Sequence, residues 1–350
     1  FPSIRARFLA KEARYLRSEE ADALLKELRP SLLVATYPVS ILEAKMLFSA
    51  KKRHIPTLLH LLSWDNITAK GRFPVITDYF IAWGDIMKEE LQEYYQVSDQ
   101  VIDTCGVAHF DQHIRIRDQE RDHRAIEHLG LDPQLPYLFF AMSSPRFVPR
   151  EIDIVEWLAQ AVQKNQFSRE LQLVVRPHPQ NIQTHMAKSS WLKRLDRLSG
   201  NRVAVDYPRL HAESNIRWSM QQEDMDHLAR LITGCAMCLN SGSTVSIDAL
   251  MHHKPVIITS FDGDKRLPYW NSARRFIAYT HLDKFIKEGG GSPVFSYQDL
   301  VHTINRYLED PHHDADRRRQ ALARECYKED GQATKRICDS LESRWLEVCK

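Results

Sequence analysis

Short runs of apolar residues alternate along this chain with stretches in which apolar residues recur every three or four positions. One such run, Cys235–Leu239, precedes a turn of small polar residues, an amphipathic stretch from Thr244 and a second apolar run at Pro255–Thr259. Apolar runs bounded by turns are typical of buried strands, and the spacing of three to four is typical of helices. The segment Leu231–Thr259 therefore predicts one strand–helix–strand unit.

The same alternation runs through the first third of the chain. A charged helical pattern over Ser3–Leu28 ends at Pro30. Strands are predicted at Ser31–Ala35, Thr57–Leu62, Asp78–Ala82 and Val101–Thr104, and helices at Ser40–Lys52, Asp85–Tyr95 and Asp118–Gly130. Strands that alternate with helices imply a parallel sheet covered on both faces.

A second alternating series follows the segment Leu131–Pro136, which contains two prolines. Besides the two strands above, it predicts strands at Tyr137–Met142, Leu171–Val175 and Val203–Val205, and helices at Glu151–Gln163, Ile182–Leu198, Glu223–Leu231, Leu282–Phe285, Leu300–Glu309, Asp314–Tyr327 and Ala333–Val348. We predict an α/β protein with two Rossmann-like domains, residues 1–132 and 133–330, and a closing helix in 331–350. The first series is short of strands, so we expect the first domain to be incomplete at its N-terminus.

Composition adds limits on compartment and partners. Apolar residues make up 43% of the chain and charged residues 27%, as in a soluble globular protein. The net charge of +2 argues neither for nor against a nucleic-acid partner. The basic residues are scattered among acids rather than collected in a tract, and we expect no such partner. No apolar run is long enough to span a bilayer, and six scattered cysteines are typical of a reducing compartment, which favours the cytoplasm. We interpret Cys235 and Cys238 as core packing rather than as a metal or redox pair.

Polar turns follow several predicted strands of the second series. Ligands of open α/β sheets bind beyond the carboxyl ends of the strands, so these turns are candidate binding loops. One of them offers consecutive backbone N–H groups and hydroxyls at the positive end of a helix, and consists of Asn240, Ser241, Gly242, Ser243 and Thr244. It predicts a phosphate site, although an ordinary helix-capping turn has the same composition. Asp248, one helical turn further on, is a candidate acceptor for a ribose or sugar diol.

Two other loops of the second series carry binding candidates. Arg176 and His178 alternate with two prolines at a strand end, which holds both side chains on a rigid backbone. Arginine suits bidentate phosphate binding, and histidine can donate to the same group. Ser143 and Ser144 follow another strand and are either phosphate or base ligands or a capping turn. We predict that the Arg176–His178 corner and the turn before Thr244 meet around one nucleotide phosphate.

The first domain contributes candidates for catalysis. The loop Ser63–Gly71 follows a strand and combines a tryptophan, a carboxylate, an amide, hydroxyls and a lysine. Asp65 is the first candidate for the base that deprotonates an attacking hydroxyl, and His60 and His109 are alternatives. The tryptophan of the loop either stacks on a sugar or base or fills an interface.

Several motifs of common catalytic and nucleotide-binding sites are absent from the sequence. It contains no GxGxxG after a strand, no GxxxxGK[ST], no HExxH and no GxSxG, which argues against dinucleotide oxidoreductases, P-loop kinases, zincins and α/β-hydrolases. No DxD motif with suitable flanks occurs either, so we expect neither a metal nor a cofactor. In that case protein cations and a helix end must neutralise a leaving phosphate.

Four motifs together resemble a known fold family. They are RPHP at 176–179, NSGSTVSIDAL at 240–250, KPVI at 254–257 and DGQAT at 330–334. This succession resembles bacterial GT-B-fold glycosyltransferases of surface-polysaccharide synthesis, mainly over Tyr137–Val348. The resemblance is closer to the Kdo and sialic acid transferases of capsule and lipopolysaccharide, looser to UDP-N-acetylglucosamine 2-epimerases, and extends to CDP-glycerol glycerophosphotransferases.

The resemblance implies roles and a reaction. His178 matches the histidine that contacts the nucleotide phosphate, and Asp248 stands where many GT-B enzymes carry a glutamate for the ribose. The implied activity is metal-independent transfer of a sugar from a CMP-, UDP- or other nucleotide-activated donor to a glycan or lipid-linked acceptor, in a cleft between two domains, with peripheral contact to the inner face of the membrane. Residues 331–350 would cross back to the first domain. A 2-epimerase, a glycerophosphotransferase and a catalytically silent binding protein are the alternatives.

Overall fold

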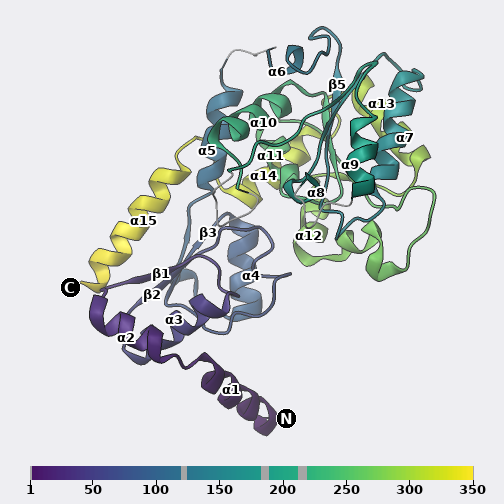
Figure 1. Ribbon diagram of the computed structural model, residues 1–350. Coiled ribbons are helices and arrows are strands. Elements are labelled where there is room, and N and C mark those ends of the chain that lie inside the picture. The colour runs from purple at the N-terminus through teal and green to yellow at the C-terminus, as the bar shows by residue number, and fades with distance from the viewer. Residues whose placement is uncertain (1, 120–123, 183–188, 212–218, 350) are drawn as a thin grey trace. The chain divides into compact units, whose positions relative to one another are not determined.

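The computed structural model describes residues 2–119, 124–182, 189–211 and 219–349 (Figure 1). The chain forms two compact units, each with its own parallel sheet. Unit 1 comprises Phe1–Asp111 and Ala323–Lys350, and unit 2 comprises Gln112–Leu322. The change from one unit to the other therefore falls before the segment Leu131–Pro136 in which the sequence placed a domain boundary.

Unit 2 is built on six parallel strands in the order β10-β9-β8-β5-β6-β7. Their bounds are β5 Tyr137–Ala141, β6 Gln172–Arg176, β7 Val203–Val205, β8 Met237–Asn240, β9 Val256–Thr259 and β10 Ser292–Val294. From β5 the chain first proceeds to β6 and β7 on one side and then returns to β8 on the other. This is the strand order of a Rossmann fold, and its reversal beside β5 makes a topological switch point.

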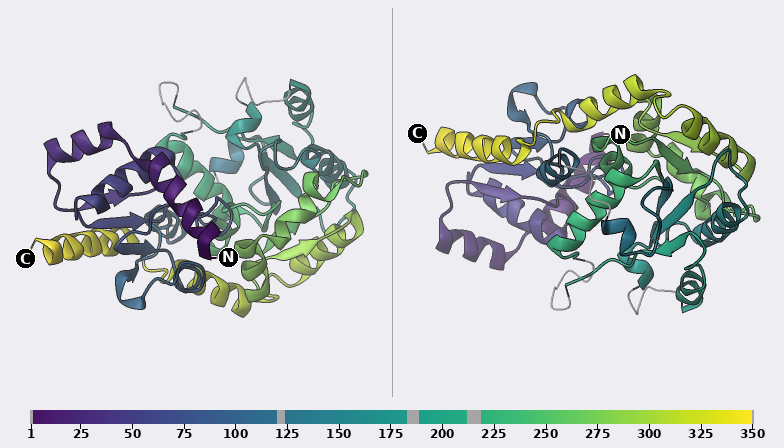
Figure 2. Two further views of the ribbon diagram at one scale, coloured as in Figure 1. Left: turned by 90° about the horizontal axis from the view of Figure 1, so that it is seen from below. Right: turned by 90° about the horizontal axis from the view of Figure 1, so that it is seen from above.

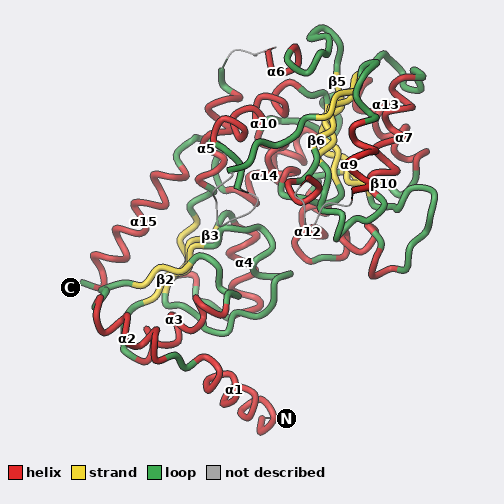
Figure 3. Tube along the Cα trace, viewed as in Figure 1, coloured by secondary structure: helices red, strands yellow, loops and turns green. Residues whose placement is uncertain are grey.

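Helices cover both faces of this sheet (Figures 1 and 3). The helices of this part of the chain are α5 Ala108–Arg117, which begins in unit 1, α6 Arg124–Glu127, α7 Glu151–Gln163, α8 Pro179–Ile182, α9 Ser189–Asp196, α10 Gln222–Gly234, α11 Val245–Met251, α12 Thr280–Glu288, α13 Tyr297–Glu309 and α14 Ala315–Cys326, which ends in unit 1, with 3-10 turns η2 Tyr269–Asn271 and η3 Ala273–Ala278. Helices α10 and α11 contact β5, β8 and β9, while α7 and α13 share a hydrophobic core with the strands.

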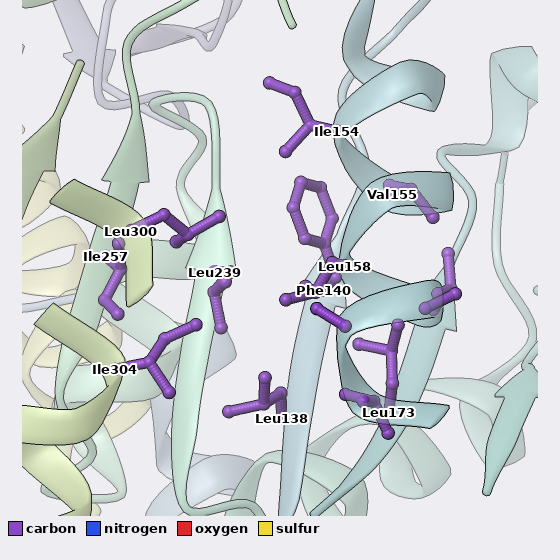
Figure 4. Packing of buried hydrophobic residues seen from close by; sticks show 14 of the residues in the cluster. Leu138, Phe140, Ile154, Val155, Leu158, Leu173, Leu239, Ile257, Leu300 and Ile304 are labelled. Atoms are coloured by element: carbon purple, nitrogen blue, oxygen red, sulfur yellow. The ribbon is translucent and has the colours of Figure 1, made fainter. Parts of the chain in front are cut away.

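That core explains why the strands of unit 2 are apolar at every position. Leu138 and Phe140 of β5 point between Leu158 of α7 and Ile304 of α13, and all four are fully buried (Figure 4). Phe139, between them, is equally buried on the opposite face. Burying a leucine or phenylalanine side chain stabilises the fold by about 1.5–3 kcal/mol, so both faces of the sheet contribute.

Unit 1 contains a smaller sheet with strand order β1-β2-β3-β4, again all parallel. Its elements are α1 Pro2–Leu16, α2 Glu19–Leu28, β1 Leu33–Ala35, α3 Ile41–Lys52, β2 Thr57–His60, β3 Tyr79–Ala82, α4 Asp85–Tyr95, η1 Asp99–Val101, β4 Ile102–Thr104 and α15 Ala333–Val348. Ile337 of α15 packs on Leu58 and Ile81. Arg344 of the same helix clamps Asp103 with two hydrogen bonds of 2.8 and 2.9 Å, so the last helix is part of unit 1.

Four element predictions differ from the structure. The helix expected at Ser3–Leu28 is two helices, because the Ser18 hydroxyl accepts from the Ala21 N–H and begins a new one. Of the helix expected at Asp118–Gly130, 120–123 lie outside the described residues, and the described remainder contains only the short helix α6. Helix α5, which ends just before this range, was not predicted. The helix expected at Ile182–Leu198 corresponds to α8 and α9, with 183–188 outside the described residues. Strand β10 was missed because Pro293 interrupts its pattern, and proline is tolerated there because β10 is an edge strand.

The remaining strands and the long helices α4, α7, α13 and α15 lie within a few residues of their predicted positions. Among the residues that the structure describes, no helix is both long and apolar enough to cross a bilayer. Figure 2 gives two further views of the same elements.

Candidate functional site

Three loops leave the same edge of the six-stranded sheet beside its switch point. Ala141 at the end of β5 pairs with Arg176 at the end of β6, and Phe140 pairs with Leu239, so that Asn240 ends β8 at the same level. Neighbouring strands lie about 4.8 Å apart, so the loops after β6 and β8 are separated by about 10 Å, with the loop after β5 between them. The predicted Arg176–His178 corner and the turn after β8 thus share one edge.

His178 presents one defined hydrogen-bond donor at this edge. Its Nδ1 accepts the backbone N–H of Gln180 at 3.1 Å, which fixes the proton of the neutral ring on Nε2. Burial lowers the pKa of His178 to about 4. The ring is therefore neutral near pH 7 and offers its Nε2–H as a hydrogen-bond donor.

Arg176 is placed differently from the sequence prediction. Leu173 and Val175 of β6 point into the core with α7, so Arg176 points to the opposite face, where it is 5% exposed. Its guanidinium forms an ion pair with Asp206 and a 2.5 Å bond to Asp224. The carboxylates of Asp206 and Asp224 already compensate the charge of Arg176. We therefore interpret this side chain as a structural group that fixes the end of β6 and the loop after it.

The turn after β8 is organised by its own first residue. The Oδ1 atom of Asn240 accepts the backbone N–H groups of Gly242 at 2.8 Å and Ser243 at 2.9 Å. Its amide donates to Ser246 Oγ at 2.9 Å. Two of the N–H groups expected to bind phosphate are thus used inside the turn. Thr244 is exposed at the start of α11 and its hydroxyl makes no capping hydrogen bond.

Gly242 is required at its position for two reasons. Its φ of +93° lies in the left-handed region that side chains disfavour. A Cβ atom there would also lie 2.6 Å from Cδ2 of Leu282 in α12. The turn can therefore approach α12 this closely only with glycine.

A buried glutamate joins two of the loops, and the sequence analysis missed it. Oε2 of Glu151 accepts the N–H of Ser143 at 2.7 Å, and its Oε1 accepts the hydroxyl of Ser241 at 2.6 Å. Burial raises the pKa of Glu151 to about 7, against the opposing effect of these hydrogen bonds. The sequence held a signal, because Glu151 stands three and seven residues before Ile154 and Leu158 on the apolar face of α7.

The loop after β5 is held at both ends. Ser144 is buried, and its carbonyl accepts the N–H groups of Phe147 and Val148 in a helical turn. Asn181 of α8 donates to the Ser143 carbonyl at 3.2 Å. Ser144 thus fits the capping alternative, while Ser143 stands between the loops that follow β6 and β8.

In unit 2, hydrogen bonds link Thr233 to His252 and His252 to His113, which lies beside Asp248. Thr233 donates to the Ala229 carbonyl at 2.8 Å and therefore accepts from Nδ1 of His252 at 2.9 Å. Burial lowers the pKa of His252 to about 2, so this neutral ring accepts on Nε2 from Nδ1 of His113, also at 2.9 Å. Nε2 of His113 then faces Asp248 Oδ1 at 3.8 Å. These hydrogen bonds fix which His113 nitrogen lies beside Asp248.

The candidates in unit 1 occupy distinct settings. Burial lowers the pKa of His60, which ends β2 as a neutral imidazole. Asp65 is already engaged, because it accepts from Ser63 Oγ at 2.6 Å and pairs with Lys70 at 2.9 Å. The ring of the neighbouring Trp64 is buried and donates to Glu325 at 3.1 Å, which favours packing over stacking on a ligand. His109 is exposed near the start of α5.

Several solved structures have a fold similar to that of this chain. A Neisseria meningitidis UDP-GlcNAc 2-epimerase bound to UDP-GlcNAc matches with a TM-score of 0.62 at 12% identity, over 95% of this chain and 81% of that one. A Rickettsia africae glycosyltransferase matches with a TM-score of 0.54 at 10% identity, over 98% and 82%. The wall teichoic acid polymerase TagF with CDPG matches with a TM-score of 0.53 at 15% identity, over 91% and 73%. The fold is that of the GT-B proteins.

At these identities the likeness shows the fold and not the substrate. No protein-family model matches the sequence, and no curated protein matches it significantly. The solved structures share the fold that the motif resemblance implied, while the likeness to Kdo or sialic acid transferases stays a prediction.

Proposed function

We propose that this protein is a nucleotide-sugar-dependent glycosyltransferase whose unit 2 binds the nucleotide part of the donor at the switch point. One observation carries this proposal: His178 presents a neutral Nε2–H at the edge of the sheet where β8 also ends and the turn with Ser243 and Thr244 begins. The sheet has Rossmann order, and the solved structures with this fold include proteins bound to UDP-GlcNAc or soaked with CDPG.

The proposed chemistry assigns the leaving phosphate to unit 2. As the bond between the anomeric carbon and the phosphate oxygen breaks, its electron pair moves to the phosphate. A hydrogen bond from His178 to that oxygen becomes stronger as the charge develops, which is how a fixed donor lowers a barrier. Hydroxyls of Ser243 and Thr244 add neutral donors, and Arg176 acts through the backbone that it braces. Asp248 remains the proposed ribose acceptor.

For the acceptor, we favour His60 of unit 1 as the general base. Its neutral imidazole can take the proton of an acceptor hydroxyl while that oxygen forms the new glycosidic bond. Asp65, favoured by the sequence, already accepts from Ser63 and pairs with Lys70, so both of its carboxylate oxygens are engaged. His109 is the remaining candidate. The proposed acceptor is a surface glycan or a lipid-linked sugar.

A panel of nucleotides would test the binding part of this proposal first. UDP, CMP, CDP and their sugar conjugates are added to the full chain, and the unfolding temperature is measured. Binding to the native state raises that temperature by mass action, so at least one pyrimidine nucleotide should raise it by several degrees at saturating concentration. If no nucleotide changes the unfolding temperature, unit 2 is not a donor domain.

Epimerisation is the second candidate, because the same fold occurs in UDP-GlcNAc 2-epimerases. Nuclear magnetic resonance of the donor with enzyme and no acceptor separates the two reactions. Transfer predicts an unchanged sugar until an acceptor glycan is supplied and free nucleotide afterwards. Appearance of the C2 epimer without acceptor would replace transfer by epimerisation, and CDP-glycerol consumption would indicate glycerophosphotransfer.

A further inference from the structure

A pocket lies at the opposite edge of the unit 2 sheet from the proposed donor site. It encloses about 540 Å³, which is within the size range of small-molecule sites. Pro136, Ala236 and Pro255 line it, and they directly precede or begin the amino ends of β5, β8 and β9. The ends of α13 and α14 complete the wall through Leu308 and Ala315. The donor loops leave the carboxyl ends of the same strands, so the two sites are distinct.

The charged residues that line this amino-edge pocket, among those the structure describes, are all basic. Its lining includes Arg169, Lys254, Arg318 and Arg319, together with three histidines. None of the lining residues that the structure describes is an aspartate or glutamate. Cations gathered around a concave surface raise the local concentration of anions and favour their binding. The chain as a whole is nearly neutral, so this pocket is a local departure from its charge balance.

The cations of the pocket play two different roles. Arg318 is buried and pairs with Asp314, and its Nη2 donates to the Pro311 carbonyl at 3.0 Å, so it fixes the wall. Arg169 is exposed and has no side-chain hydrogen bond or ion pair with any described residue. Arg319 has only a surface pair with Asp316, and such pairs are worth little. Arg169 and Arg319 can therefore turn to a ligand at low cost.

The corner between α11 and β9 supports a binding role for this wall. Lys254 N–H donates to the Ala249 carbonyl at 3.0 Å, and His253 N–H donates to the Leu250 carbonyl at 2.8 Å. These two bonds make a helix ending whose left-handed position usually holds glycine. Here it holds His253, with a φ of +57°. Keeping a histidine in this conformation costs stability, and the residue is part of the pocket lining. Its Nε2 lies 3.3 Å from Nη1 of Arg117.

We propose that the amino-edge pocket binds a small phosphorylated molecule. Arg169, Arg319 and Lys254 would contact the phosphate, since guanidinium and ammonium groups are the usual partners of phosphate oxygens. The apolar floor of Pro136, Pro255 and Leu308 would contact the organic part, because the volume exceeds that of a phosphate alone. This inference concerns a different edge from the proposed donor site and does not depend on it.

Titration calorimetry with glucose 1-phosphate, and with glucose as the uncharged control, tests the proposal on the full chain. The proposal predicts binding of glucose 1-phosphate but not of glucose. The variant Arg169→Gln/Arg319→Gln, which changes two exposed residues, should lose roughly tenfold or more in affinity. Lys254→Gln should behave likewise. The control Lys164→Gln/Lys193→Gln removes the same charge from exposed positions outside the pocket and should bind normally.

Competition decides whether the pocket is separate. Saturating UDP and the variant His178→Ala should both leave glucose 1-phosphate binding unchanged. The proposal is overturned if glucose 1-phosphate does not bind, if the Arg169/Arg319 variant binds it as the wild type does, or if UDP displaces it. Binding to vesicles that contain phosphatidic acid, without binding to glucose 1-phosphate, would also overturn it in favour of a lipid headgroup. A failure of UDP binding would count only against the donor site.

Discussion

At the scale of single residues, buried polar groups define the edge of unit 2 more than exposed ones do. Glu151 holds Ser143 and Ser241, and Arg176 holds Asp206 and Asp224. Burying such groups is costly unless each is hydrogen-bonded, so their positions are fixed once the sheet has formed. Their removal therefore gives direct predictions.

Replacing Glu151 tests the protonation of this edge. Its pKa is raised from 4.5 to about 7, so the native state binds the proton more tightly than the unfolded chain does. The stability contribution is complete below pH 4.5 and is lost as pH rises through 7. Relative to Glu151→Gln, which mimics the neutral acid, the wild type should lose on the order of 3 kcal/mol of unfolding free energy between these values. Urea unfolding across this pH range measures it, and parallel pH profiles would refute the assignment.

Replacing Arg176 should act on stability before it acts on binding. The variant Arg176→Ala leaves two buried carboxylates without their cation, a change that typically costs about 3–5 kcal/mol. Arg169→Ala, which removes an exposed arginine without partners among the described residues, should change the unfolding free energy by about 0.5 kcal/mol at most. Urea unfolding compares the two. If Arg176→Ala lowers the unfolding free energy by less than about 1 kcal/mol, Arg176 becomes a candidate phosphate ligand again.

At the scale of elements, the periodicity of apolar residues predicted the strands of both sheets except β10, and the long helices α4, α7, α13 and α15. It placed the turn after β8 and the loop after β6 at strand ends because these segments are bounded by proline, glycine and small polar residues. It could not reveal which face Arg176 points to, since that depends on the alternation of β6 against a core formed by distant residues. Glu151 was overlooked because a glutamate at the start of a helix is ordinarily an exposed capping residue.

Gly242 supplies a test of the element that carries the proposed phosphate hydroxyls. Gly242→Ala requires a methyl group 2.6 Å from Leu282 in addition to an unfavourable φ, so α12 or the turn must move. Gly130→Ala is the matched control, because Gly130 also has a positive φ but open space around it. Gly242→Ala should lower the unfolding free energy by about 1–3 kcal/mol more than the control does. Equal losses would mean that the turn tolerates the contact.

At the scale of the whole molecule, we propose that the donor binds at the switch point of unit 2 and that a different ligand binds at the amino edge of the same sheet. The fold comparisons extend over more than nine-tenths of this chain, so the similarity of fold is not limited to unit 2. Sequence motifs were sufficient to suggest that fold. They could not separate transfer from epimerisation, because proteins of similar fold include both a glycosyltransferase and a UDP-GlcNAc 2-epimerase.

Hydrogen exchange would locate the nucleotide on the molecule. Ligand contact slows the opening of the backbone that it touches. Addition of UDP should therefore slow exchange in residues 142–144, 177–181 and 241–245, which leave the carboxyl edge, and spare 252–254 at the amino edge. Slower exchange confined to residues 252–254 would place the nucleotide in the amino-edge pocket instead.

The most direct test of the central claim is the affinity for a nucleotide sugar of wild type, His178→Ala and the exposed control His302→Ala, measured by titration calorimetry between pH 5 and pH 8. The account predicts a loss of about 1–3 kcal/mol for His178→Ala alone. Because the pKa of His178 is lowered to about 4, it also predicts that the wild-type affinity hardly changes over this range. Unchanged affinity of His178→Ala, or a wild-type affinity that titrates near pH 6.5, would contradict it.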